Sequence, residues 1–120
     1  MSITNFEEFT HELTSEEMEI LPIVVHGFRN YKKENPIKAQ LIVDRMNEYL
    51  LARGFKTRMS QPRLRKMVNY IRTNGLLPLI ATSNGYFTTD CKLTIQEQIK
   101  SLQERANSIK RCAIGLEKFL

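Results

Sequence analysis

The stretch SQPRLRKMVNYIRTNGLLPLIATSNGYFTT, residues 60–89, decides the fold of this 120-residue chain. Ser60 and the proline two residues later are typical of a helix N-terminus, because serine accepts an orphan backbone N–H and proline has none to lose. Gly75 marks the end of this helix, so we expect it to cover residues 61–74. Four apolar residues fall within one arc of about 100° at helical spacing. The predicted buried face consists of Leu64, Met67, Val68 and Ile71.

Two short apolar segments follow this helix and are predicted to pair as a β-hairpin. They cover residues 76–81 and 86–89, and TSNG at residues 82–85 lies between them. Asn-Gly flanked by apolar and aromatic residues is a strong hairpin signal. Pro78 restricts the first strand to an edge, since proline cannot donate to a neighbouring strand. Tyr86 and Phe87, the aromatic residues of the second segment, are expected in the core.

Two further helices are expected before this stretch. The first begins at Thr14, within the capping box TSEE, and is expected to end near Lys33, with a kink or break near Pro22. The second covers residues 38–52 and is closed by Gly54, which suits a left-handed C-cap position. The predicted apolar faces are Met18, Leu21, Val25 and Phe28 in the first helix and Leu41, Ile42, Met46, Tyr49 and Leu50 in the second.

The last helix is expected to begin at a second capping box, TIQE at residues 94–97. Apolar residues then recur at alternating intervals of four and three as far as Leu120, the spacing of a coiled-coil seam about 39 Å long. This stripe either pairs with a second copy of the chain or folds back over its own domain, and its length favours a homodimer. The predicted dimerisation residues are Ile95, Ile99, Leu102, Ala106, Ile109, Ala113 and Leu116.

Basic residues are concentrated around the predicted helix 61–74. No acidic residue lies between Glu48 and Asp90, whereas residues 1–28 hold six acids and neither Lys nor Arg. Residues 29–120 hold 18 basic and seven acidic residues, a net charge of +11. Such a surface attracts a polyanion, because neutralising phosphates releases condensed counterions. The seven basic residues of the acid-free window are Arg53, Lys56, Arg58, Arg63, Arg65, Lys66 and Arg72.

The polar face of helix 61–74 carries three arginines and one lysine, and it has no acid to pair with them. Arg65 and Asn69 lie near the centre of this face. Arginine can pair with the major-groove edge of guanine, and asparagine with that of adenine. Lysine and tyrosine side chains suit phosphates.

Three helices, a two-stranded hairpin and a long helix follow one another in the order of the winged helix-turn-helix family, which residues 14–89 resemble. Residues 60–89 carry the strongest likeness, to small DNA-binding proteins of bacteriophages and other mobile elements. The resemblance implies a mainly α fold with a small β-hairpin, in which residues 61–74 lie in the major groove and the hairpin forms a wing. It implies base-edge contacts at Arg65 and Asn69 and phosphate contacts at Lys56, Arg58, Arg63 and Lys66. The other candidate DNA contacts are Gln61, Tyr70 and Asn84. The wing departs from the family pattern, since residues 82–85 include no Arg or Lys for a minor groove.

These patterns divide the chain into an acidic N-terminal arm (residues 1–13), a winged-helix domain (14–90) and a C-terminal heptad helix (91–120). We expect a dimeric DNA-binding protein, a transcription regulator or accessory factor, whose partner is double-stranded DNA. The alternative is a winged-helix interaction module that docks an acidic protein partner in a replication or regulatory assembly.

The sequence indicates neither an enzyme nor a cofactor or metal site. It contains no Gly-rich phosphate loop and no nucleophile–base pair. Cys91 and Cys112 lack CxxC spacing, and His11 and His26 have no ligand cluster beside them. The N-terminal residues lack the composition of a signal peptide, and the longest apolar run is far too short for a membrane span. We therefore expect a cytoplasmic protein in a reducing setting, with no membrane partner.

Overall fold

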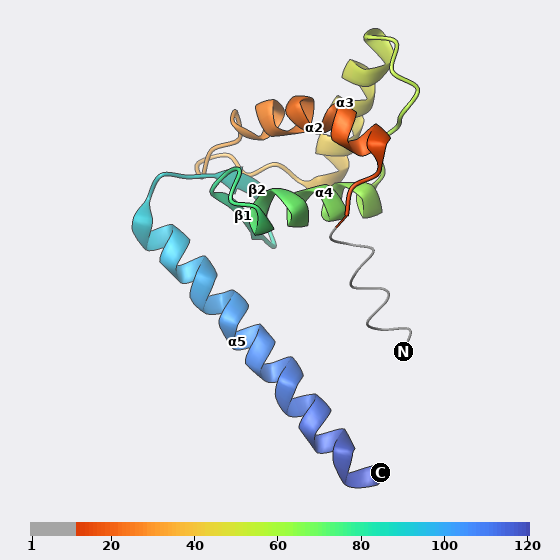
Figure 1. Ribbon diagram of the computed structural model, residues 1–120. Helices are drawn as coiled ribbons and strands as arrows, with labels where there is room; N and C mark the ends of the chain where they lie inside the picture. Colours follow the sequence, from red (N-terminus) through yellow and green to blue (C-terminus); the bar gives the residue numbers. More distant parts are fainter. Residues whose placement is uncertain (1–11) are drawn as a thin grey trace. The chain divides into compact units, whose positions relative to one another are not determined.

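The computed structural model describes residues 12–120, so residues 1–11 of the predicted acidic arm lie outside the described part. The predicted architecture, mainly helical with a small antiparallel hairpin and a long C-terminal helix, is confirmed (Figure 1). The chain divides into two compact units, the residues up to Thr89 and Asp90–Leu120. The elements are α2 (Ser15–Phe28), α3 (Ala39–Ala52), α4 (Gln61–Thr73), β1 (Leu79–Thr82), β2 (Gly85–Thr88), α5 (Lys92–Leu116) and the short 3-10 helix η1 (Glu117–Phe119).

α2 begins at the predicted capping box, in which Thr14 and Glu17 exchange two hydrogen bonds between side chain and backbone. The expected break at Pro22 is wrong, because the helix continues through it. Proline has no N–H, so the Met18 carbonyl loses its usual helical hydrogen bond from residue 22. Pro22 and Met18 are both exposed, so water can donate a hydrogen bond to that carbonyl instead. The helix ends at Phe28, earlier than expected, because the following residues turn to pair with the hairpin.

The buried face of α2 is rotated by one residue from the predicted one. Met18 is 46% exposed, and Leu21 and Val25 are only partly buried. The first buried residue of this face is acidic, and a prediction from apolar spacing overlooks such a residue. The buried residues are Glu17, Ile20, Val24 and Phe28.

α3 forms where expected, and its buried side is close to the predicted stripe. Leu41 and Tyr49 are 43% and 41% exposed and so do not belong to the core. The guanidinium of Arg53 lies over the Tyr49 ring, 4.7 Å from its centroid. Gly54 adopts the predicted left-handed conformation with φ of +79°. The buried residues of α3 are Ile42, Val43, Met46 and Leu50.

α4 agrees with the prediction in its start and in all four buried side chains, and it ends at Thr73, one residue before the expected Asn74. Ser60 caps it, its Oγ accepting the backbone N–H of Arg63 at 3.3 Å. The preceding residue, Met59, is fixed to α3 because the Asn47 amide accepts its N–H at 2.6 Å and donates to its carbonyl at 3.0 Å. The position of α4 is therefore set by both a local cap and a contact with α3.

The hairpin pairs Leu79 with Thr88 and Thr82 with Gly85, so β1 begins three residues later than predicted. The preceding residues instead complete the turn after α4, where Leu76 donates its N–H to Ile71 at 2.9 Å. The segment between α2 and α3 pairs with the other edge of β2. Thr88 donates its N–H to the Tyr31 carbonyl at 2.7 Å, and Ile37 forms a bridge with Tyr86.

This third extended segment explains the glycine at the hairpin turn. Gly85 has a φ of +126°, and a Cβ atom there would run into the carbonyl of Ile37. Glycine is therefore required both by the backbone conformation and by the close approach of the neighbouring segment.

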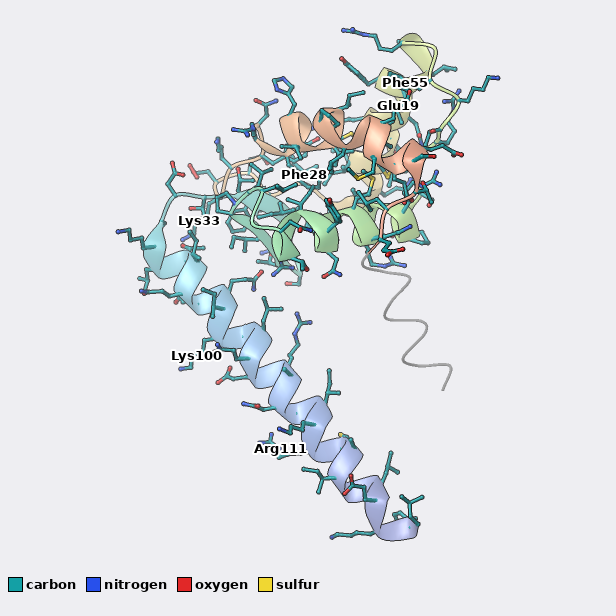
Figure 2. The ribbon with its side chains drawn as sticks, in the orientation of Figure 1. Glu19, Phe28, Lys33, Phe55, Lys100 and Arg111 are labelled. Carbon is teal, nitrogen blue, oxygen red and sulfur yellow. The ribbon has the colours of Figure 1, made fainter. Side chains whose placement is uncertain are left out.

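The aromatic residues connect α2 to the hairpin. Phe28 lies at the centre of the helical unit in Figure 2, and its ring meets those of Tyr31 and Tyr86 edge to face at centroid distances of 5.7 and 5.9 Å. Phe87 is buried as expected, and Tyr86 is half-buried against the core. These contacts fix the hairpin to the helices.

α5 begins at Lys92, and the predicted capping box at Thr94 is wrong. Cys91 is the N-cap residue and its side chain makes no capping bond, while Thr94 is buried within the first turn. The stripe that was predicted for dimerisation is exposed from Ile99 onward. No helix in residues 12–120 combines the length and the apolar character that a membrane crossing requires.

Candidate nucleic-acid interface

The centre of the polar face of α4 carries two side chains without partners. Arg65 and Asn69 are exposed, and neither side chain forms a hydrogen bond or ion pair within residues 12–120. They lie one turn apart on a helix whose opposite face is buried. Their donor groups are therefore available to a ligand, as the sequence led us to expect for contacts with base edges.

Two of the predicted phosphate contacts, in contrast, are already paired. The carboxylate of Glu17 on α2 accepts hydrogen bonds from Arg63 Nε at 2.8 Å and from Lys66 Nζ at 2.7 Å. The expectation that no acid would pair with this face is therefore wrong, because α2 brings an acid from outside the basic window. We call Glu17, Arg63 and Lys66 the Glu17 cluster.

Glu17 is only 2% exposed, so its charge depends on these partners. Burial raises the pKa of its carboxyl group. Hydrogen bonds from Lys66, from the Thr14 backbone and from Arg63 outweigh that effect and lower the pKa from its usual 4.5 to about 2. The cluster thus keeps a carboxylate ionised at the interface of α2 and α4, and it compensates positive charge at that edge of the polar face.

The arginine in the loop before α4 donates hydrogen bonds to the backbone of that loop. Arg58 Nη1 donates to the carbonyls of Phe55 at 2.6 Å and Thr57 at 3.0 Å. The Arg58 carbonyl in turn accepts from Arg63 Nη1 at 2.7 Å. The predicted phosphate contact at Arg58 therefore belongs to a network that holds the loop on the Glu17 cluster.

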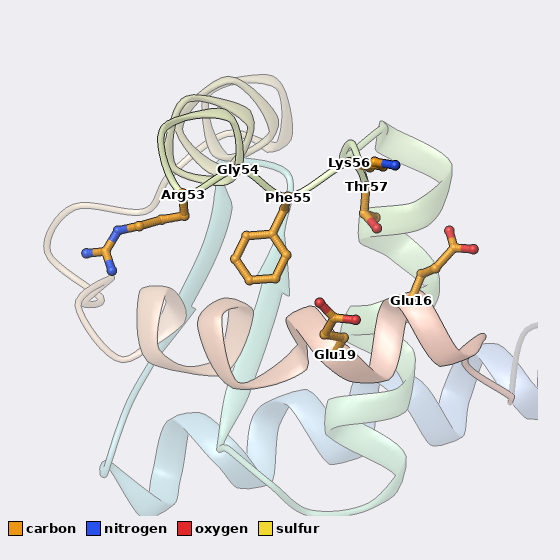
Figure 3. Close-up of a pocket in the computed structure, with 7 residues that line it drawn as sticks. All are labelled: Glu16, Glu19, Arg53, Gly54, Phe55, Lys56 and Thr57. Carbon is orange, nitrogen blue, oxygen red and sulfur yellow. The ribbon is translucent and has the colours of Figure 1, made fainter.

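Lys56 lines an open pocket of about 640 Å³ between this loop and α2. Figure 3 shows the carboxylates of Glu16 and Glu19 directed from α2 toward the loop, with the Phe55 ring beside them. The two acids lower the local positive potential that Lys56 contributes. This weakens the case for Lys56 as a phosphate contact relative to a cation remote from acids.

Gln61 and Tyr70 lie at the borders of the polar face. Gln61 Nε2 donates to Gln40 Oε1 of α3 at 2.7 Å, and Gln40 donates to Asp44 at 2.9 Å. Tyr70 is half-buried. Gln61 thus has a structural role in joining α3 to α4, and this bond occupies one of the two N–H donors of its amide.

A lysine outside the hairpin contacts its tip, and the sequence did not predict this contact. Lys38, at the N-cap of α3, donates from Nζ to the Ser83 carbonyl at 2.8 Å. Asn84 beside it is exposed, and its backbone N–H donates to Thr82 Oγ1 at 3.2 Å. Lys38 and Ser83 are 45 positions apart in the sequence, which explains why local patterns did not predict this pairing.

A second, apolar pocket of about 400 Å³ lies between α2 and α3. Ile23, Tyr31, Met46 and Tyr49 line it, and Arg45 belongs to the same lining. None of the predicted DNA contacts does. Residues 12–120 contain no group of three or more His, Cys, Asp or Glu side chains placed to hold a metal ion.

Comparisons with protein-family models, with curated proteins and with solved structures found no match to this chain.

Proposed function

We propose that this chain is a DNA-binding protein of the winged-helix type that places α4 in the major groove and acts as a homodimer through α5. The observation that carries the proposal is the pair Arg65 and Asn69 at the centre of the polar face of α4, which is exposed and has no partner among the described residues. The fork of arginine donors fits guanine O6 and N7, and the asparagine amide fits adenine N6 and N7.

The charge at the hairpin tip also supports the proposal, in which the hairpin acts as the wing. Lys38 supplies a positive charge at its tip, beside the exposed Asn84, so a phosphate or a minor-groove edge near the hairpin would meet a cation. A role as a transcription regulator or accessory factor of a mobile element remains part of this proposal.

A second candidate function is a module that docks an acidic protein partner. The apolar pocket between α2 and α3 favours it, because an anchor side chain there would meet Ile23 and Met46, with Arg45 for an acidic neighbour.

Fluorescence anisotropy of a labelled duplex, titrated at about 50 and 200 mM salt, separates the two candidates. A protein that neutralises about four phosphates loses affinity with a log–log salt slope of roughly −3.6. The docking module shows feeble binding at both concentrations and no preference among sequences. Such a result would refute the DNA-binding proposal.

A matched pair of double variants ties the result to α4. Arg65→Ala with Asn69→Ala removes the proposed base contacts, and we expect at least about tenfold weaker binding to a selected site. Asn107→Ala with Arg111→Ala removes the same residue types at the same spacing from exposed positions of α5. Equal losses in the two variants would contradict the assignment of α4.

A further inference from the structure

The apolar stripe of α5 is exposed along most of the helix. Ile99 is 48% exposed, Ile109 71% and Leu116 68%. A continuous apolar stripe of this length on a charged helix marks an interaction surface. In heptad terms, the stripe alternates a positions (Ile99, Ala106, Ala113) with d positions (Ile95, Leu102, Ile109, Leu116).

A parallel pairing of two such helices matches each stripe residue with its own copy. The layers at Ala106 and Ala113 then hold two alanines each, on either side of a layer with two copies of Ile109. The isoleucines keep the helices apart while the alanine layers are left underfilled, which creates voids. Parallel pairing also brings Arg105 beside Lys110 of the second copy, a like-charge contact that occurs twice by symmetry.

An antiparallel pairing removes both problems. In the register that places Ala106 opposite Ile109 of the second copy, Ala113 lies opposite Leu102. Every alanine then faces a large side chain, which gives layers of even volume. Shifting the register by a heptad leaves large stripe residues without a counterpart, either Leu116 or both Ile95 and Ile99. The outermost layer within α5 pairs Ile99 with Leu116.

The flanking residues also suit this register. Arg105 lies beside Cys112 of the second copy, and Lys110 lies beside Gln103, so no like charges meet. The two helix dipoles point in opposite directions, which is favourable for neighbouring helices. Side-chain volume and charge therefore select the same orientation.

We propose that α5 pairs in antiparallel orientation with α5 of a second copy, with Ala106 opposite Ile109 and Ala113 opposite Leu102. This inference refines, and rests on, the homodimer of the proposed function. The two copies of the first unit then join the helix pair at opposite ends. At 1.5 Å per residue, the two Cys91 residues lie about 50 Å apart along the pair.

The native cysteine at position 91 allows a direct test on the full-length chain. Cys91 is exposed, and Cys112→Ser removes the other thiol from an exposed site. A spin label on Cys91 should give a pulsed-EPR distance near about 50 Å. In a parallel pair the two labels lie at the same end, on helices about 8–10 Å apart. A short distance, or a monomeric mass in sedimentation with no distance at all, would overturn the proposal.

Disulfide trapping gives a second measurement that does not depend on the label. With both native cysteines replaced by serine, Leu102→Cys and Ala113→Cys are prepared as separate proteins. Oxidation should give crosslinked dimers only when the two are mixed, whereas a crosslink within either variant alone would establish the parallel pair.

DNA affinity, measured separately by anisotropy, keeps the two proposals distinguishable. If the EPR distance is long but the protein does not bind DNA, the antiparallel helix pair stands and the proposed function is refuted. If the distance is short and the protein binds DNA, the proposed function stands and the antiparallel pair is refuted.

Discussion

The edge of the polar face of α4 that lies beside α2 and the centre of that face both carry basic residues, but they differ in what these residues contact. Arg63 and Lys66 face α2 and pair with the buried Glu17. Arg65 and Asn69 point away from the protein and have no partner in residues 12–120. The difference teaches that a basic sequence does not by itself give a basic surface. The edge beside α2 contributes to folding, and the centre of the face is left for a ligand.

Removal of Glu17 tests the folding side of this comparison and should have the largest effect. Glu17→Ala loses the capping bond and leaves two partly buried cations without their counter-ion, so we expect a loss of about 3 kcal/mol in the free energy of unfolding. Urea denaturation measures it. Glu19→Ala, at an exposed position of the same helix, should change stability by less than about 0.5 kcal/mol. Similar losses in both variants would show that the cluster does not stabilise the fold.

Acid should remove the same contribution. The pKa of Glu17 is lowered from 4.5 to about 2 in the folded protein. The stabilisation is therefore fully present above about pH 4.5 and is lost as the pH falls toward 2. Measured between pH 2 and 6, the difference in unfolding free energy between the wild type and Glu17→Gln should shrink over this window. A difference that stays constant would mean that the charge of Glu17 contributes nothing.

Glu17→Gln should also make the two cations of the Glu17 cluster available for DNA binding. The neutral amide forms no ion pair and has one acceptor oxygen where the carboxylate has two, so it holds Arg63 and Lys66 less firmly. We expect duplex affinity to rise by about threefold to tenfold at low salt, with a steeper salt slope, although the fold is less stable. Affinity that falls in step with stability would place these cations outside the DNA-binding surface.

The smallest effect is expected at the hairpin. Lys38→Ala removes the cation from the tip, and we expect about threefold weaker duplex binding and a salt slope smaller by about one unit. Lys100→Ala, which removes an exposed lysine from α5, serves as the charge-matched control and should leave the slope unchanged. Identical behaviour of the two variants would exclude the hairpin from the interface.

How far the sequence predicted each element depended on whether its signals were local. α4 was predicted almost to the residue, because the apolar arc lies within the element and Ser60 and Gly75 lie within two residues of its ends. The buried face of α2 was wrong by one position, because the burial of Glu17 depends on partners 46 and 49 residues away.

The candidate site follows the same rule. Arg65 and Asn69 were predicted from helical spacing alone, and the structure leaves both exposed. The pairing of Arg63 and the position of Lys38 at the hairpin tip could not be predicted, since each is set by residues distant in sequence. Long-range ion pairs therefore decide which cations of a basic stretch are available.

The most direct test compares Arg65→Ala with Arg63→Ala in binding to one duplex, with both proteins shown to be folded at the temperature of the titration. Arg65→Ala should weaken binding by at least about tenfold, because it removes an unpartnered side chain at the centre of the face. Arg63→Ala should weaken it by less than about threefold, because Glu17 and the Arg58 carbonyl already hold that guanidinium. Equal losses, or a larger loss for Arg63→Ala, would contradict the division of the polar face of α4 into an edge that contributes to folding and a centre that binds DNA.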